Sequence, residues 1–371
     1  MSLDRSYGNI YIQTTRSTYT AGDQVDGFVH LNLSRDFPSN VLHLIVHGEE
    51  DVKLVTTTTR TDSENRTHTD VYVHTDKNEF FSHTFPLYSN GGNYFLRGQY
   101  SFPFSFKLLD TLPGTFKKTW REHDEDCHGE VYYKLWAGLK HSKKNSGLFD
   151  EFELRVDQQF QESMGNQTRS FNKKLQGYCY QDIGEFGLQC TFQSDSYRVN
   201  DVANMLISVD NTQAKVAVKS VECILWQDTY VKTSCGRHSK SMAHVVSQFS
   251  LPGVPTGQAR TGDSAMPLRL PIRTTSDLEA TCSGTMIQNS FRLEVREELD
   301  ACLCCESSPN NQISIKIYNK DNFVMPMMPL QQDWQPQVMM PYVCTMTSEY
   351  RMSRDFKNDL VMNTNAQYPM Y

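Results

Sequence analysis

Cysteines are the residues of this sequence whose type and spacing could most directly do chemistry. Three stand in the run Cys302-Leu-Cys304-Cys305, and Cys179 and Cys190 lie near the start of the same half of the chain. Thiolates gathered from these two places could close a tetrahedral structural zinc site. The same side chains could instead be buried reduced thiols, or exposed thiols that are S-acylated beside a membrane. All three interpretations stay open, because the run at 302–305 lacks paired C-x-x-C spacing. The candidate zinc ligands are Cys179, Cys190, Cys302, Cys304 and Cys305.

A second group of metal-ligand types lies in the run His123-Asp-Glu-Asp-Cys127-His128. It places two imidazoles, a thiol and three carboxylates close together, but the loose spacing equally fits a solvated loop. The sequence has no phosphate-binding Gly-rich loop, no nucleophile elbow, no H-E-x-x-H and no dinucleotide fingerprint. We therefore expect no catalytic residues, no cofactor and no small-molecule substrate, with structural zinc as the one alternative.

The overall charge gives no reason to expect nucleic acid as a partner. The 371 residues carry a formal net charge of -7, with a pI of 5.9. The first residues lack the apolar core of a signal peptide, and no stretch reaches the roughly 20 apolar residues of a spanning helix. These features predict a cytoplasmic protein with mostly reduced cysteines.

Strand patterns dominate the chain and occur twice in the same order. Tyr19 and Gly22 precede an alternating apolar run at 25–33, and Tyr197 and Asn200 precede another at 203–209. Alternation is typical of antiparallel strands with one buried face, as in Val131, Tyr133, Leu135, Ala137 and Leu139. The predicted fold is all-β, with two tandem β-sandwiches. The predicted boundaries are a first domain at 1–157, a connector at 158–177, a second domain at 178–320 and an extended tail at 321–371.

The tail differs in composition from both domains. Nine of the fifteen methionines lie in it, among several prolines. Flexible Met side chains and repeated prolines suit an extended segment that docks either on its own sandwich or on a partner. Met352, Phe356 and Leu360 stand four residues apart, so a short amphipathic helix could present them together to a protein partner.

Three runs in the first half resemble the arrestin family, and α-arrestins most closely. They are Leu96-Arg-Gly-Gln-Tyr-Ser-Phe-Pro-Phe-Ser-Phe-Lys-Leu108, Leu112-Pro-Gly-Thr-Phe116 and Gly129-Glu-Val-Tyr-Tyr-Lys-Leu135. The resemblance covers about residues 7 to 320. It implies two immunoglobulin-like arrestin sandwiches and a non-enzymatic adaptor that links membrane protein cargo to trafficking or signalling machinery. A structural subunit of a large stable assembly, such as a retromer-like coat or a cytoskeletal complex, is the alternative, because a fold alone does not fix a function.

Two basic segments are the candidate contact surfaces. Thr56–Thr75 carries Arg60 and Arg66 and resembles the loops with which arrestins touch cargo or receptor. Lys140, Lys143 and Lys144 form a basic loop suited to phosphate or anionic lipid head groups, so peripheral contact with the endosomal or plasma membrane is a further expectation. The first strand, Tyr7–Gln13, lacks the basic pair of receptor-binding arrestins, and the chain has no Pro-Pro-x-Tyr motif for ubiquitin ligases.

Overall fold

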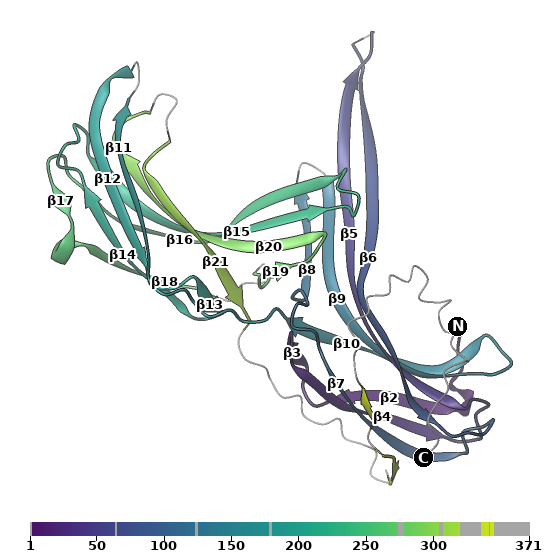
Figure 1. Ribbon diagram of the computed structural model, residues 1–371. Helices are drawn as coiled ribbons and strands as arrows, with labels where there is room; N and C mark the ends of the chain where they lie inside the picture. The colour runs from purple at the N-terminus through teal and green to yellow at the C-terminus, as the bar shows by residue number, and fades with distance from the viewer. Residues whose placement is uncertain are drawn as a thin grey trace. The chain divides into compact units, whose positions relative to one another are not determined.

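The computed structural model describes residues 2–63, 65–122, 125–177, 180–273, 278–303, 307–319, 335–340 and 342–344. The chain divides into two compact units, one formed by Met1–Gln159 with the described tail strands and one formed by Phe160–Asp321. Both units are built from strands, and the described residues contain no α-helix (Figure 1). None of the described elements is a helix long and apolar enough to cross a membrane.

The first unit consists of two sheets. The larger has the order β1-β10-β9-β5-β6, with β3 beside β10 and β8 beside β9; the smaller has the order β2-β4-β7, with β22 and β23 beside β7. The bounds of the larger sheet are β1 Ser2–Leu3, β3 Thr18–Thr20, β5 Val41–Thr61, β6 Thr67–Ser89, β8 Phe116–Glu122, β9 Glu125–Lys140 and β10 Ser146–Asp157. Those of the smaller sheet are β2 Gly8–Thr14, β4 Gln24–Leu33, β7 Gly98–Lys107, β22 Gln337–Val338 and β23 Tyr342–Cys344, and a short 3-10 helix, η1, spans Arg5–Tyr7.

Side chains from both sheets meet in the core of the first unit. Every predicted inward residue of β9, from Val131 to Leu139, is fully buried, as the alternation predicts. The rings of Phe85 in β6 and Phe106 in β7 stack at 5.9 Å, which joins the two sheets directly. The unit is therefore a sandwich.

The second unit also has two sheets. One has the order β11-β12-β14-β17 with β18 beside β14, and the other has the order β13-β21-β20-β15-β16 with β19 beside β20. The first comprises β11 Gln167–Gln176, β12 Asp182–Phe192, β14 Val202–Asp210, β17 Ala259–Arg260 and β18 Met266–Pro271. The second comprises β13 Ser196–Arg198, β15 Val218–Lys232, β16 Ser239–Val254, β19 Cys282–Ser283, β20 Ile287–Leu299 and β21 Asn310–Tyr318, with a 3-10 helix, η3, at Gly262–Ser264. One continuous apolar core takes residues from both sheets, among them Phe186, Ile207, Leu225, Leu293 and Ile315.

The predicted duplication is visible in the topology. Tyr19 in β3 pairs in parallel with Val156 in β10, and Tyr197 in β13 pairs in parallel with Ile317 in β21. Each short strand enters a turn closed by an Asp carboxylate that accepts a backbone N–H. The positive φ angles of Gly22, 92°, and Asn200, 75°, fall at the same place in the two turns, where glycine and asparagine are the tolerated residues.

The predicted connector at 158–177 is partly wrong, because its second half forms β11. This strand pairs with β12 along its whole length but lies at the edge of the sheet. Leu175 is its one fully buried apolar residue, so the sequence shows little alternation there. Residues 158–166 contain no strand and remain a connecting segment.

Gly27 provides a test of how closely the neighbouring strands of the smaller sheet pack. A Cβ at this position in β4 would lie 2.3 Å from the backbone oxygen of Gln13 and 2.5 Å from the Phe104 ring. We expect Gly27→Ala to lower the free energy of unfolding by about 2 kcal/mol or more, because the backbone neighbour cannot move aside. Gly92→Ala, whose Cβ would meet no atom closer than 3.7 Å, is the control. Equal denaturation curves for the two variants would contradict this packing.

Candidate functional site

Within the run His123–His128, the described side chains of Cys127 and His128 lie in different surroundings. Cys127 is fully buried, whereas His128 lies partly exposed, with Nδ1 2.9 Å from the Thr119 hydroxyl and Nε2 3.4 Å from a Glu130 carboxylate oxygen. Neighbouring residues of a strand face opposite sides of the sheet, which explains the separation. His123 lies outside the described residues. Among the residues that the structure describes, no group of three His, Cys, Asp or Glu side chains could hold a metal ion.

Cys190 and Cys302 lie in different surroundings. The Cys190 thiol is fully buried in the core of the second unit, and burial raises its pKa to about 12. The side chain of Cys302 is exposed instead. An isolated bridge between Gly177 and Leu303 joins the two chain segments that carry the other cysteines. Cys179, Cys304 and Cys305 themselves lie outside the described residues.

The predicted loop at Thr56–Thr75 is mostly strand. β5 and β6 pair from Val41–Ser89 to Thr61–Thr67, with register shifts at Leu42/His43 and Gly48/Glu49, so residues 62–66 connect the two strands at the tip. β9 supports β5 only as far as the pair Lys53–His128, so the outer part of the hairpin is a two-stranded ribbon within this sheet (Figure 1). We call the segments Leu54–Thr61 and Thr67–His74 the outer ribbon. β-branched threonines favour strands, and this propensity outweighs the polarity that suggested a loop.

The outer ribbon carries Arg60, and the turn at its tip carries Arg66. The Arg60 guanidinium is largely exposed and lies 3.4 Å from the Asp70 carboxylate across the ribbon. At the turn, the backbone N–H of Arg66 donates to Asp62 at 2.9 Å, and a His68 ring nitrogen lies 3.0 Å from the other Asp62 oxygen. The two cations therefore sit near the end of a projecting hairpin, in reach of a partner.

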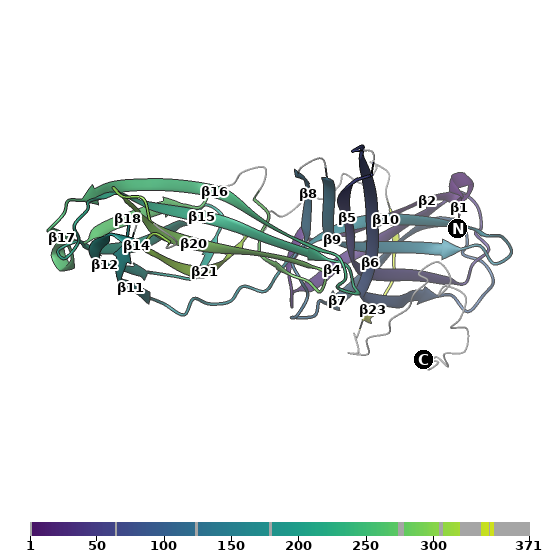
Figure 2. The same ribbon diagram turned by 90° about the horizontal axis from the view of Figure 1, so that it is seen from above.

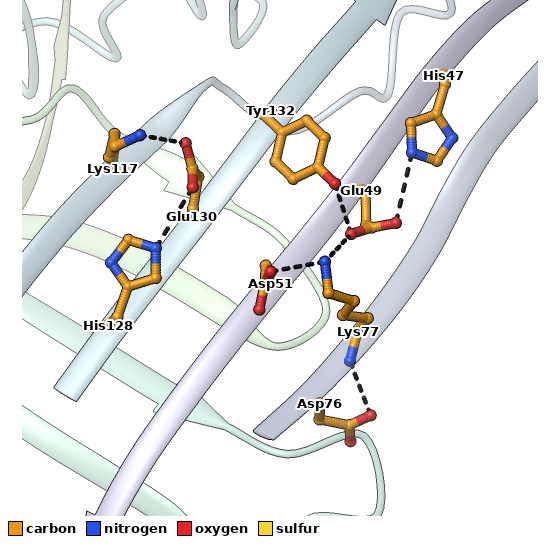
Figure 3. A network of polar contacts seen from close by, with 9 residues as sticks. All are labelled: His47, Glu49, Asp51, Asp76, Lys77, Lys117, His128, Glu130 and Tyr132. Atoms are coloured by element: carbon orange, nitrogen blue, oxygen red, sulfur yellow. Dashed lines mark hydrogen bonds and ion pairs between the residues drawn. The ribbon is translucent and has the colours of Figure 1, made fainter. Parts of the chain in front are cut away.

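A polar network joins the three strands at the base of this ribbon (Figure 3). The Lys77 Nζ atom of β6 lies 2.9 Å from Glu49 and 2.7 Å from Asp51, both in β5. The Tyr132 hydroxyl of β9 donates to Glu49 at 2.5 Å. His47 lies 3.4 Å from Glu49 and 3.1 Å from Glu79, whose strand is β6. Sequence spacing could not reveal these contacts, since Glu49 and Tyr132 are 83 positions apart.

The network holds its charges in place. Burial opposes the charge of Glu49, but hydrogen bonds from His47, Tyr132 and Lys77 outweigh it and lower the pKa of this carboxyl to about 2. Hydrogen bonds to Asp51 and Glu49 raise the pKa of Lys77 to about 12. The pKa of His47 is also raised, because its contacts with Glu49 and Glu79 outweigh burial. The network therefore fixes the hairpin where the support of β9 ends.

The basic loop at Lys140–Lys144 connects β9 and β10. Lys140 ends β9, while Lys143 and Lys144 are exposed in the turn, where the Lys143 N–H donates to a ring nitrogen of the buried His141 at 3.0 Å. The sequence alone does not predict that Arg35, like Lys144, lies near Asp4. The charge of Arg35 and that of Lys144 both lower the pKa of Asp4, after the larger effect of the hydrogen bonds from Ser6.

The tail docks on its own first sandwich over the residues that are described. β22 and β23 run parallel to β7, pairing Gln337 with Tyr100 and Tyr342 with Phe104. These two strand pairings leave Phe102 and Pro103 of β7 between them, and Pro103 has no N–H to donate. Met352, Phe356 and Leu360 lie outside the described residues.

Each of the two units is a β-sandwich, and known sequence families match both. The arrestin (or S-antigen) N-terminal domain matches residues 8–161, and the corresponding C-terminal domain matches residues 184–322. The chain belongs to the arrestin family.

One relative is "Arrestin domain-containing protein A" of Dictyostelium discoideum. It is 30% identical over 144 residues, which cover 37% of this chain and 25% of that protein. The match thus spans about a quarter of the relative's length. It is consistent with an α-arrestin-like protein, and family membership favours an adaptor or scaffold function.

Glu49→Gln tests the network through pH. The pKa of Glu49 is about 2 in the folded chain against an ordinary value of 4.5, so its charge stabilises the fold fully above pH 4.5. That contribution is lost as pH falls from 4.5 towards 2. We expect the variant to be about 2 kcal/mol less stable than the wild type at pH 7, with a difference that shrinks below pH 4.5. Urea denaturation at a series of pH values measures this.

Glu153→Gln, at an exposed position of β10, is the matched control and should follow the wild type throughout. If the difference in unfolding free energy between Glu49→Gln and the wild type stays the same at every pH, the role given to the charge of Glu49 is contradicted.

Proposed function

We propose that this chain is a non-enzymatic arrestin-like adaptor that links membrane protein cargo to trafficking or signalling machinery. The observation that carries the proposal is the pair of arrestin domains over residues 8–161 and 184–322. Their rigid sheets offer contact surfaces on projecting hairpins and turns, which is where binding residues concentrate in sandwich folds. The proposed location is the cytoplasm, at the inner face of the endosomal or plasma membrane.

In this proposal the two basic segments have the same chemical task. Arg60 and Arg66, near the end of the outer ribbon, and Lys143 and Lys144, in the β9–β10 turn, present exposed cations. Such groups suit phosphorylated cargo tails or anionic lipid head groups. The tail segment with Met352, Phe356 and Leu360 would then engage a separate protein partner, so that two weak contacts act together.

The charge of the β9–β10 turn can be tested directly. Lys143→Glu with Lys144→Glu should weaken binding to vesicles that contain phosphatidylserine by about tenfold or more, because each lysine near such a surface contributes on the order of 1 kcal/mol. The effect should decrease at high salt. Sedimentation of vesicles with the bound protein measures it.

Two charge reversals elsewhere in the first unit, Lys53→Glu with Lys107→Glu, keep the net charge of the variant the same and serve as the control. Equal binding by the two double variants would remove the turn from the contact surface.

The adaptor function itself is tested by mild affinity purification from native cells, using the full chain and a chain that ends at Asn319. Substoichiometric membrane proteins together with coat or ubiquitin machinery are the expected co-purifying partners. A complex of fixed stoichiometry that is lost with the tail would instead identify a structural subunit of a stable assembly.

A further inference from the structure

The strand β6 contains a segment that is complementary to itself. His68–Asp76 reads His-Thr-Asp-Val-Tyr-Val-His-Thr-Asp. If this segment is placed antiparallel to a second copy with Tyr72 opposite Tyr72, every histidine faces an aspartate, every valine faces a valine and every threonine faces a threonine. A histidine ring N–H can donate to an aspartate carboxylate, and like β-branched residues pack well across strands, so both kinds of pair are favourable.

The same segment lies on an open sheet edge. β6 is the last strand of its sheet, with β5 on one side, and in the part of the chain that the structure describes no strand pairs with its other side. The ladder with β5 runs through 68–76 without a bulge. A regular edge strand presents a row of backbone donors and acceptors that can accept another strand.

The centre of this edge is apolar and exposed. Val71, Tyr72 and Val73 are 59%, 51% and 55% exposed, and together they place apolar side chains on both faces of the ribbon. The usual protections of an edge are missing, because 68–76 contains no proline, no lysine and no bulge. A two-stranded ribbon is also marginally stable by itself, so two further strands would stabilise it.

The His and Asp side chains favour one pairing register between the two copies. Along an edge strand, the N–H and C=O groups of every second residue point outward. Two copies that pair through the same edge must therefore match an even-numbered residue with an even-numbered one, or an odd-numbered residue with an odd-numbered one. Moving the centre from Tyr72 to Val71 places His68 opposite His74. Moving it to Val73 places Asp70 opposite Asp76. The neighbouring registers therefore oppose like residues, and the register centred on Tyr72 gives four His–Asp pairs.

We propose that this chain forms a symmetric dimer in which the outer edges of two β6 strands pair antiparallel about Tyr72, joining two ribbons into one four-stranded sheet. The partner is thus a second copy of this chain, in an isologous contact with two-fold symmetry. The proposal goes beyond the adaptor function, which needs only one copy.

The contacts that Asp70 and His74 already make are compatible with this pairing. The Asp70 carboxylate lies 3.4 Å from Arg60 and His74 Nε2 lies 3.2 Å from the Thr56 hydroxyl, and both partners belong to β5. The second copy would approach from the opposite side of β6. Asp70 would then lie between Arg60 of its own chain and His74 of the second copy, both of which can donate to its carboxylate.

Sedimentation velocity of the full chain over a range of concentrations tests the proposal. We expect a concentration-dependent monomer–dimer equilibrium. Val71→Lys with Val73→Lys, which places lysine opposite lysine in both pairs, should shift the equilibrium fully to monomer. Thr57→Lys lies on β5 beside Val71, at an exposed position of the same ribbon, and should leave the dimer unchanged. The same variants keep the basic turn at Lys143, so vesicle binding through that turn reports on the proposed function separately.

A charge exchange tests the register. Asp70→His alone creates a His–His pair and His74→Asp alone creates an Asp–Asp pair, twice in each dimer. Either change should weaken dimerisation by roughly tenfold, and the double variant, which restores His opposite Asp, should recover wild-type affinity to within about threefold. Asp70→His and the double variant both lose the Arg60 contact, so recovery cannot come from the fold of the single chain. A wild type that stays monomeric, a dimer insensitive to lysines at 71 and 73, or a double variant no better than the single ones would each overturn the proposal.

Discussion

Backbone hydrogen bonding at the sheet edges is the constraint on which the rest of this structure depends. Among the residues that the structure describes, the four sheets are open, so each leaves strands whose outer N–H and C=O groups need partners or solvent. At some edges the outermost strand is very short, as in β1 and β13, so few backbone groups are left without a strand partner there. Described tail strands cover the edge of β7 along Tyr100–Ser101 and Phe104–Phe106, and Pro103 between these segments has no N–H to donate. β6 leaves the longest regular edge of the first unit without a strand partner among the described residues (Figures 1 and 2).

The polar network explains how a long hairpin can serve as a contact arm. Ion pairs and hydrogen bonds around Glu49 tie β5, β6 and β9 together just below the point where β9 ends its support. These charges are only partly solvated, so they are worth more than surface pairs, and their loss would loosen the base rather than the tip. The outer ribbon can then vary in its contacts while its position on the sandwich stays fixed. Rigid support with an adaptable end is the common arrangement of binding loops on sandwich folds.

The sequence predicted the fold well where one face of a strand is buried. The alternation of Val131 to Leu139 and the repeated turn at Gly22 and Asn200 were sufficient, since each reflects a local rule of strands or of positive φ. The sequence does not predict β11, because its edge position removes the alternation. It also does not predict the outer ribbon, because the polar threonines suggest a loop although they form strands. The candidate site was harder to predict. The Glu49 network joins residues distant in the chain, and the inward position of Cys190 depends on the register of β12.

Hydrogen exchange of backbone amides in the full chain, compared with a chain that ends at Asn319, tests most directly whether edge coverage decides which surfaces this protein offers. The tail should slow exchange at the amides of β7 that face it, while its removal should speed exchange there and leave the central strands β4 and β12 unchanged. Equal exchange along Gly98–Lys107 in the two chains would contradict a tail that closes this edge.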